Sequence, residues 1–136
     1  MLAVGLMERE KGKEGERQAA RFLRSLGYAD AYRGQQYSGV EGRDAVIPSR
    51  PNVHVEAKYG YGTSATNHVG SAHLREWYAQ ARRDAGDRFP IVLWKPFRAR
   101  AWRLTCLWYG VLATVTDPGD MQTIIDAYGN GEGEPS

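Results

Sequence analysis

Apolar residues recur at the three- and four-residue spacing of an amphipathic helix in three segments of the chain. The first segment covers residues 13–26 and ends at Gly27, a residue suited to the C-terminus of a helix. The second begins at Ser71 and continues to residue 85, and the third begins at Asp117 and Pro118, a favourable cap and first residue. The apolar faces that we expect to be buried comprise Ala19, Ala20, Leu23 and Leu26, then Leu74, Trp77, Tyr78 and Ala81, and finally Met121, Ile124, Ile125 and Tyr128.

Five shorter segments have the apolar content or the alternation of β-strands. The clearest covers residues 53–58, where apolar and polar residues alternate strictly and therefore face opposite sides of a sheet. The others cover residues 28–33, 44–47, 90–94 and 101–107. The order helix, three strands, helix, two strands, helix predicts an α/β fold in which helices flank a mixed central sheet. We expect one domain over residues 1–128 and a disordered acidic, Gly-rich tail over residues 129–136.

Composition narrows the class of protein. With 42% hydrophobic and 25% charged residues over 136 positions, the chain is typical of one soluble globular domain. No segment approaches the roughly 18 apolar residues of a membrane span, and the N-terminus lacks the features of a secretory leader. The single cysteine, Cys106, excludes an internal disulfide. We therefore expect a cytoplasmic, intracellular protein that is not secreted, with Cys106 as a small core residue.

Charge is distributed unevenly along the chain, although the net charge is only +2. Residues 117–136 contain five acids and no Lys or Arg, which leaves 18 basic and 11 acidic residues, a net charge of +7, in residues 1–116. This excess of positive charge in residues 1–116 favours a nucleic-acid partner, because neutralisation of phosphates dominates the affinity of proteins for DNA. From charge alone, an ordinary and slightly basic soluble protein is the alternative.

Candidate chemistry lies on the alternating strand and on the segment before it. Glu56 and Lys58 share a face, about 7 Å apart along the strand, and Asp44 can lie beside Glu56 if the two segments pair as a hairpin. Two adjacent carboxylates form a hard oxygen site for Mg²⁺, with Mn²⁺ as a substitute. Such a metal activates water against a phosphodiester, and Lys58 would stabilise the developing charge. Alternatively, the face of His54, Glu56 and Lys58 is simply exposed to solvent, with a weak ion pair.

The first predicted helix adds a third acid. Glu16 lies seven residues before Leu23, and therefore on the apolar stripe that faces the sheet. A carboxylate there is costly unless it is paired or bound to a metal, so Glu16 is a further candidate ligand. Alternatively, it is a residue near the start of the helix that the helix dipole favours. A neighbouring basic stripe, suited to DNA phosphates, comprises Arg17, Arg21 and Arg24.

This combination resembles the PD-(D/E)xK nuclease superfamily, in which an acid and then Glu-x-Lys on the next strand bind a divalent metal and hydrolyse DNA. The chain more closely resembles the archaeal-type Holliday junction resolvases and their phage relatives, which begin with Lys-Gly-x-x-x-Glu-Arg. Here residues 11–17 read Lys-Gly-Lys-Glu-Gly-Glu-Arg. The family's Asp falls on Asp44 and its Glu-x-Lys on residues 56–58. Its Arg before a Gly/Ser loop falls on Arg33, followed by Ser38. The loop differs from the short archaeal one, and Arg43 replaces the Pro before the Asp.

The resemblance, which covers about residues 11–104, implies a restriction-endonuclease-like fold and a function. It implies a homodimeric, Mg²⁺-dependent endonuclease that resolves four-way DNA junctions by paired nicks, without a membrane or a small-molecule cofactor. The implied catalytic residues are Glu16, Asp44, Glu56 and Lys58, with the three acids as metal ligands, and the implied contacts with the scissile strand are Arg17, Arg33 and Ser38. The alternatives are a restriction- or repair-type nuclease of the same superfamily, a DNA-binding protein with vestigial acids, and an interaction domain without a nucleic-acid partner.

Overall fold

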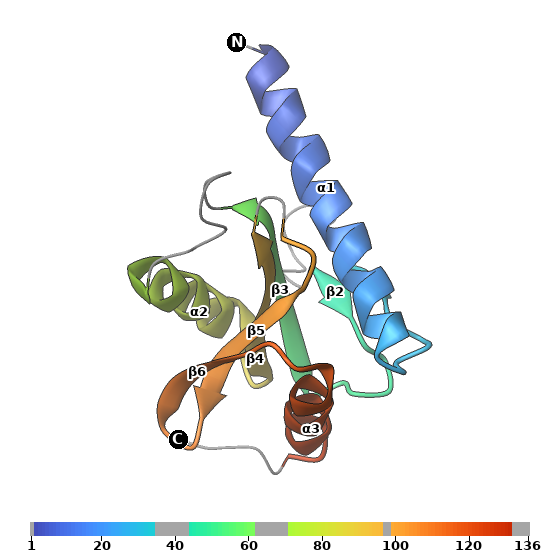
Figure 1. The fold of residues 1–136 in the computed structure, drawn as a ribbon, viewed down its shortest axis with the longest axis vertical. Helices are drawn as coiled ribbons and strands as arrows, with labels where there is room; N and C mark the ends of the chain where they lie inside the picture. The colour runs from blue at the N-terminus through green and yellow to red at the C-terminus, as the bar shows by residue number, and fades with distance from the viewer. Residues whose placement is uncertain (1, 35–43, 62–70, 97–98, 132–136) are drawn as a thin grey trace.

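A computed structural model describes residues 2–34, 44–61, 71–96 and 99–131 (Figure 1). Within these residues, six strands form one sheet in the order β1-β2-β3-β4-β5-β6, in which β3 and β4 are parallel and the other pairs are antiparallel. The prediction of an α/β fold with a mixed sheet and flanking helices is therefore confirmed. The elements are α1 (Leu2–Ser25), β1 (Tyr32–Arg33), β2 (Ala45–Val46), β3 (Val53–Tyr61), α2 (Ser71–Ala85), β4 (Phe89–Pro96), β5 (Arg103–Trp108), β6 (Val111–Val115) and α3 (Pro118–Gly129).

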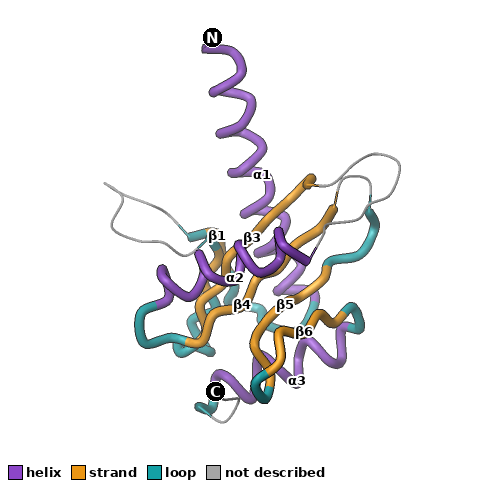
Figure 2. Tube along the Cα trace, turned by 90° about the vertical axis from the view of Figure 1, so that its left-hand side faces the viewer, coloured by secondary structure: helices purple, strands orange, loops and turns teal. Residues whose placement is uncertain are grey.

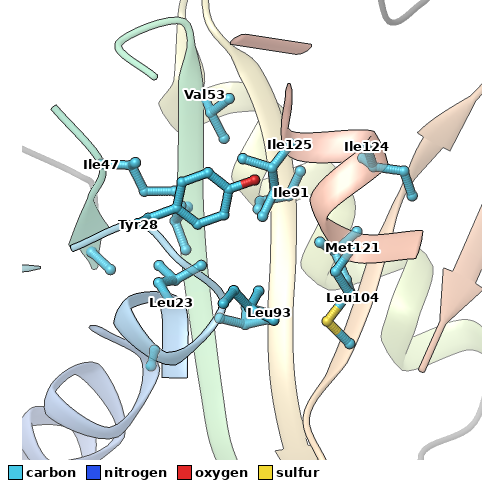
Figure 3. Close-up of a cluster of buried hydrophobic side chains, with 14 of the residues drawn as sticks. Leu23, Tyr28, Ile47, Val53, Ile91, Leu93, Leu104, Met121, Ile124 and Ile125 are labelled. Carbon is cyan, nitrogen blue, oxygen red and sulfur yellow. The ribbon is translucent and has the colours of Figure 1, made fainter. Parts of the chain in front are cut away.

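The helices cover opposite faces of the sheet. Helix α2 connects the parallel strands β3 and β4, as a parallel pair requires, and it packs on one face, whereas α1 and α3 pack on the other (Figure 1). Seen from the α2 side, this helix lies across the strands, and the first turns of α1 extend beyond the sheet (Figure 2). The larger core lies under α1 and α3, where Leu23, Ile91, Leu93 and Ile125 gather (Figure 3).

The predicted helix faces agree with the observed cores. All four residues predicted for the buried face of the first helix are buried, although Leu26 lies just after α1, and so are all four of α3. On α2, Trp77 and Ala81 are buried against Val92 and Trp94 of β4, whereas Leu74 and Tyr78 are only partly buried beside them. Cys106 is buried in the larger core, as predicted. Within the described residues, no helix has a stretch both long and apolar enough to cross a membrane.

Helix α1 is longer than the sequence pattern predicts, since it begins at Leu2 rather than at residue 13. Its C-terminus lies where expected. Gly27 has a φ of +111°, its amide donates to the carbonyl of Arg24 at 3.0 Å, and the amide of Tyr28 donates to the carbonyl of Leu23 at 3.2 Å. This pair of hydrogen bonds around a left-handed glycine is the Schellman motif, which satisfies the last helical carbonyls.

The predicted strand over residues 28–33 is only partly correct, because Tyr32–Arg33 alone pairs with β2. Tyr28 instead lies in the turn after α1. Its buried ring packs into the larger core, and its hydroxyl donates to Oδ1 of Asp126 on α3 at 2.7 Å. Burial and the carboxylate of Asp126 raise the pKa of Tyr28 well above its usual range. The Tyr28 side chain therefore stabilises the packing of α3 rather than a strand.

Strand β6 was missed by the sequence analysis. It forms a hairpin with β5 in which Trp108 lies opposite Val111. The two connecting residues, Tyr109 and Gly110, have φ values of 50° and 82°. Positive φ at both positions is the type I′ geometry that suits the twist of a hairpin. The usual signal for this turn is Asn-Gly or Asp-Gly, and a tyrosine in the first position conceals it.

Two connecting segments and most of the predicted tail fall outside the described residues. The connecting segments are residues 35–43 and 62–70, and β3 reaches Tyr61 rather than ending at residue 58 as predicted. Gly129 is the last residue of α3, and residues 132–136 of the predicted tail also lie outside the description.

Candidate active site

Pairing of β2 with β3 brings two of the predicted site residues together. The strands are antiparallel with Ala45 opposite Val55, so that Asp44 comes opposite Glu56, as the hairpin hypothesis requires. The amide of Asp44 donates to the carbonyl of Val55 at 3.0 Å, and the amide of Ala57 donates to Oδ2 of Asp44 at 2.8 Å. Asp44 is therefore attached to β3 through both its backbone and its side chain.

The polar face of β3 is buried rather than solvated. Asp44 is 8% exposed, Glu56 is 5% exposed and His54 is fully buried. This face is the one that α2 covers, since Glu56 lies beside Val92 of the α2 cluster. The solvent-exposed alternative for His54 and Glu56 is therefore wrong. Because a buried carboxylate is costly unless it is paired or bound, the two acids require a specific explanation.

Electrostatics support the proximity of the predicted residues. Burial and the neighbouring charge of Glu56 raise the pKa of Asp44 to about 8, and Glu16 adds to this rise. The hydrogen bond from Ala57 and the charge of Lys58 act in the opposite direction but do not cancel it. Like charges held together in a poorly solvated place are typical of sites that bind a cation or transfer protons.

Lys58 lies on the same face of β3, half-buried, and its ammonium group donates to Oε1 of Gln80 on α2 at 3.2 Å. Helix α2 thus positions the lysine side chain that the sequence pattern places beside the acids. The position of Gln80 relative to the sheet is set by the crossover from β3 to β4, and the helical pattern of α2 alone does not reveal it. The contact adds Gln80 to the site as the partner of Lys58.

Glu16 lies on the sheet-facing side of α1, as predicted. The preceding residue, Gly15, permits this close approach, because a Cβ there would lie only 2.6 Å from the Cβ of Tyr59 on β3. The charge of Glu16 reaches Asp44, yet its direct partner is Arg33 on β1, whose Nε donates to Oε1 of Glu16 at 2.9 Å. Glu16 and Arg33 therefore form a half-buried ion pair at the border of the site.

The basic stripe predicted on α1 is exposed. The Nη1 atom of Arg17 lies 3.9 Å from Oε2 of Glu14, one turn earlier on the helix. The side chain of Arg21 is exposed. Arg24 uses its Nη1 to donate to the carbonyl of Ala31 at 2.8 Å. Arg24 thus has a local structural contact, whereas the side chains of Arg17 and Arg21 are exposed. Ser38, the last predicted contact residue, lies outside the described residues.

His54 is the site residue that sequence reasoning misjudged. The alternating pattern favours a half-exposed strand residue, but the imidazole is fully buried and its Nε2 lies 3.3 Å from Oε1 of Glu56. The signal in the sequence was the two-residue spacing of His54 and Glu56, which places both side chains on one face. Its burial depends on α2, which the spacing does not reveal.

The donor set fits a hard divalent cation without forming a complete cage. Among the described residues, no group of three or more His, Cys, Asp or Glu side chains is arranged to hold a metal ion. Asp44 and Glu56 nevertheless provide two adjacent carboxylates with a raised pKa at Asp44, which is the charge environment that a cation would relieve. Mg²⁺ usually retains several waters and uses one or two carboxylates. Asp44 and Glu56 would therefore hold it, with Glu16 close by.

Comparison of the chain with protein-family models, with curated proteins and with solved structures finds no match in any of the three.

Proposed function

We propose that this protein is a divalent-metal-dependent endonuclease that cuts branched DNA, with a restriction-endonuclease-like arrangement of its sheet and helices. The observation that carries the proposal is the burial of Asp44 and Glu56 side by side, with Lys58 on the same face of β3. Two carboxylates and a lysine in this order along a hairpin fit hydrolysis of a phosphodiester better than a structural role. A buried ion pair alone would not require the second acid.

Each residue has a distinct part in the proposed reaction. Asp44 and Glu56 would hold Mg²⁺ through their carboxylates, and the ion would supply Lewis-acid stabilisation and an activated water. Lys58, positioned by Gln80, stabilises the charge that develops on the phosphate. Glu16 orients Arg33 at the border of the site, where the guanidinium can contact the DNA backbone. Arg17 and Arg21 extend this basic surface along α1, and Arg24 contributes to the same positive field.

Resolution of a four-way junction requires two cuts related by symmetry, so the proposal includes a homodimer. Trp77, Trp94 and Trp102 are buried within the protomer and are not available for that contact. The large apolar side chains that are exposed within the described residues are Tyr32, Tyr109 and Val111. Sedimentation of the protein alone and with a synthetic junction measures whether two copies associate.

The test is a nicking assay in Mg²⁺ on a synthetic four-way junction and on a linear duplex of the same sequence, using the wild type and Glu56→Gln. We expect the wild type to nick the junction in preference to the duplex, and the variant to bind the junction without cutting it. The matched control is Glu76→Gln, which removes one acid from the exposed surface of α2 and should leave cleavage unchanged.

Three other outcomes would replace the proposal. Equal cleavage of junction and duplex would indicate a restriction- or repair-type nuclease of the same superfamily. Binding without cleavage in any divalent metal would indicate a DNA-binding protein. Cleavage that persists in Glu56→Gln would show that the chemistry lies elsewhere in the molecule.

A further inference from the structure

The imidazole of His54 is enclosed in the sheet beside the candidate metal ligands and cannot contact DNA itself. It is 0% exposed, and its Nε2 lies 3.3 Å from Oε1 of Glu56. Within the described residues, its Nδ1 is buried and has no hydrogen-bond partner. A histidine that served only the packing of the core would normally have both ring nitrogens satisfied. Within the described residues, the hydrogen bond of the imidazole is therefore the one to the carboxylate of Glu56.

The direction of this hydrogen bond depends on the tautomer of the imidazole. A carboxylate that binds a metal is ionised and can only accept, so the proposed function requires the tautomer in which Nε2 donates to Oε1 of Glu56. The bond engages one oxygen of Glu56 and directs the other away from the imidazole. Asp44 is held in a comparable way, because the amide of Ala57 donates to its Oδ2. Each carboxylate of the pair thus has a hydrogen-bond donor that restricts its orientation.

We propose that His54 is a positioning residue for the metal site: it orients the Glu56 carboxylate so that Glu56 and Asp44 bind one divalent cation together. This inference rests on the proposed function, because it needs the two acids to be metal ligands. Partners that hydrogen-bond to ligating carboxylates orient them, and their removal typically weakens metal affinity about 10- to 100-fold. Removal of His54 should therefore act on metal affinity through Glu56 without removing any ligand.

The experiment measures Mn²⁺ binding by titration calorimetry on the full chain, for the wild type, Glu56→Gln, His54→Leu and His54→Gln. Leucine fills the buried space without a donor, whereas the amide of glutamine retains one at a similar reach. We expect His54→Leu to bind Mn²⁺ about 10- to 100-fold more weakly than the wild type, and His54→Gln to recover most of this loss. Circular dichroism confirms that each variant is folded.

The matched control is Thr105→Val. Thr105 is 1% exposed on the same face of the sheet, and its hydroxyl bonds to Trp94 and Thr114 rather than to an acid. The substitution disturbs a buried polar contact without touching Glu56, so we expect Mn²⁺ affinity equal to that of the wild type. An equal loss of affinity in Thr105→Val and His54→Leu would overturn the proposal, because general loosening of the core would then explain both.

The remaining outcomes separate this inference from the proposed function. If the wild type binds Mn²⁺ and Glu56→Gln does not, the metal site stands. The role of His54 alone would then be overturned by either of two results. One is an unchanged Mn²⁺ affinity in His54→Leu, and the other is a folded His54→Gln that binds Mn²⁺ as weakly as His54→Leu. If His54→Leu does not fold, the comparison of His54→Gln with the wild type decides, since a folded glutamine variant that fails to bind contradicts the proposal. If the wild type does not bind Mn²⁺, the proposed function itself fails.

Discussion

Replacement of Asp44 by asparagine should make the metal-free protein more stable while it abolishes cleavage. Burial and Glu56 raise the pKa of Asp44 from 3.8 to about 8. When folding raises the pKa of a group, its contribution to the free energy of unfolding is complete at a pH below the pKa of the unfolded chain. This contribution is lost as the pH rises to the pKa of the folded protein. The wild type therefore loses stability at Asp44 between about pH 4 and pH 8, whereas asparagine, which has no charge to bury, does not.

The magnitude follows from the size of the change in pKa. At about 1.4 kcal/mol for each pH unit, the rise from 3.8 to about 8 sets an upper limit of about 6 kcal/mol above pH 8. Local relaxation and water penetration reduce such penalties, so we expect Asp44→Asn to raise the free energy of unfolding by about 2–4 kcal/mol there. The difference should vanish near pH 4. The side-chain oxygen of asparagine can still accept the amide hydrogen of Ala57, and its NH₂ group can donate to the neighbouring carboxylate of Glu56.

The assay is urea unfolding followed by tryptophan fluorescence between pH 4 and pH 9, with EDTA present so that no divalent cation neutralises the acids. Asp84→Asn, on the exposed side of α2, is the control and should change the free energy of unfolding by less than about 0.5 kcal/mol at every pH. A variant at Asp44 that is less stable than the wild type at pH 8, or whose effect is the same at all pH values, would refute the reasoning.

Four substitutions test local packing and capping, each by the midpoint of urea unfolding. Gly15→Ala would place a methyl group 2.6 Å from the Cβ of Tyr59 and should lower the free energy of unfolding by about 1–3 kcal/mol. Gly12→Ala, with open space around it, is the control and should stabilise α1 by up to about 1 kcal/mol. Equal effects of the two substitutions would contradict the close contact. Asp117→Ala removes the N-cap of α3 and should cost about 1 kcal/mol, and no loss would mean that the cap is redundant. Thr105→Val leaves a buried indole N–H without its acceptor and should cost about 1–3 kcal/mol, and an unchanged midpoint would show that the indole finds another partner.

The local pattern of residues was sufficient to predict most of the fold. The helical spacing of apolar residues in α2 and α3, the glycine after α1 and the strict alternation of β3 are properties of segments shorter than twenty residues. Each follows from the local geometry of the backbone, in which side chains repeat every 3.6 residues in a helix and every two residues in a strand. Where the local signal was weak, the prediction was wrong or incomplete: Tyr109 and Gly110 form a hairpin turn without an Asn or Asp, so β6 was missed.

For the candidate site too, some features could be predicted from local sequence and others were decided by the tertiary structure. The spacing of Glu56 and Lys58 placed them on one face of a strand, and the helical period placed Glu16 toward the sheet, because both statements need only the geometry of one element. Antiparallel pairing of β2 with β3 decided that Asp44 lies beside Glu56, and the position of α2 decided that the polar face of β3 is buried. The hydrogen bonds of Lys58 with Gln80, of Arg33 with Glu16 and of His54 with Glu56 also arise from these packings. The burial of a side chain and its hydrogen-bond partners depend on which elements pack together in the tertiary structure. The sequence of a single segment does not reveal which element will cover it.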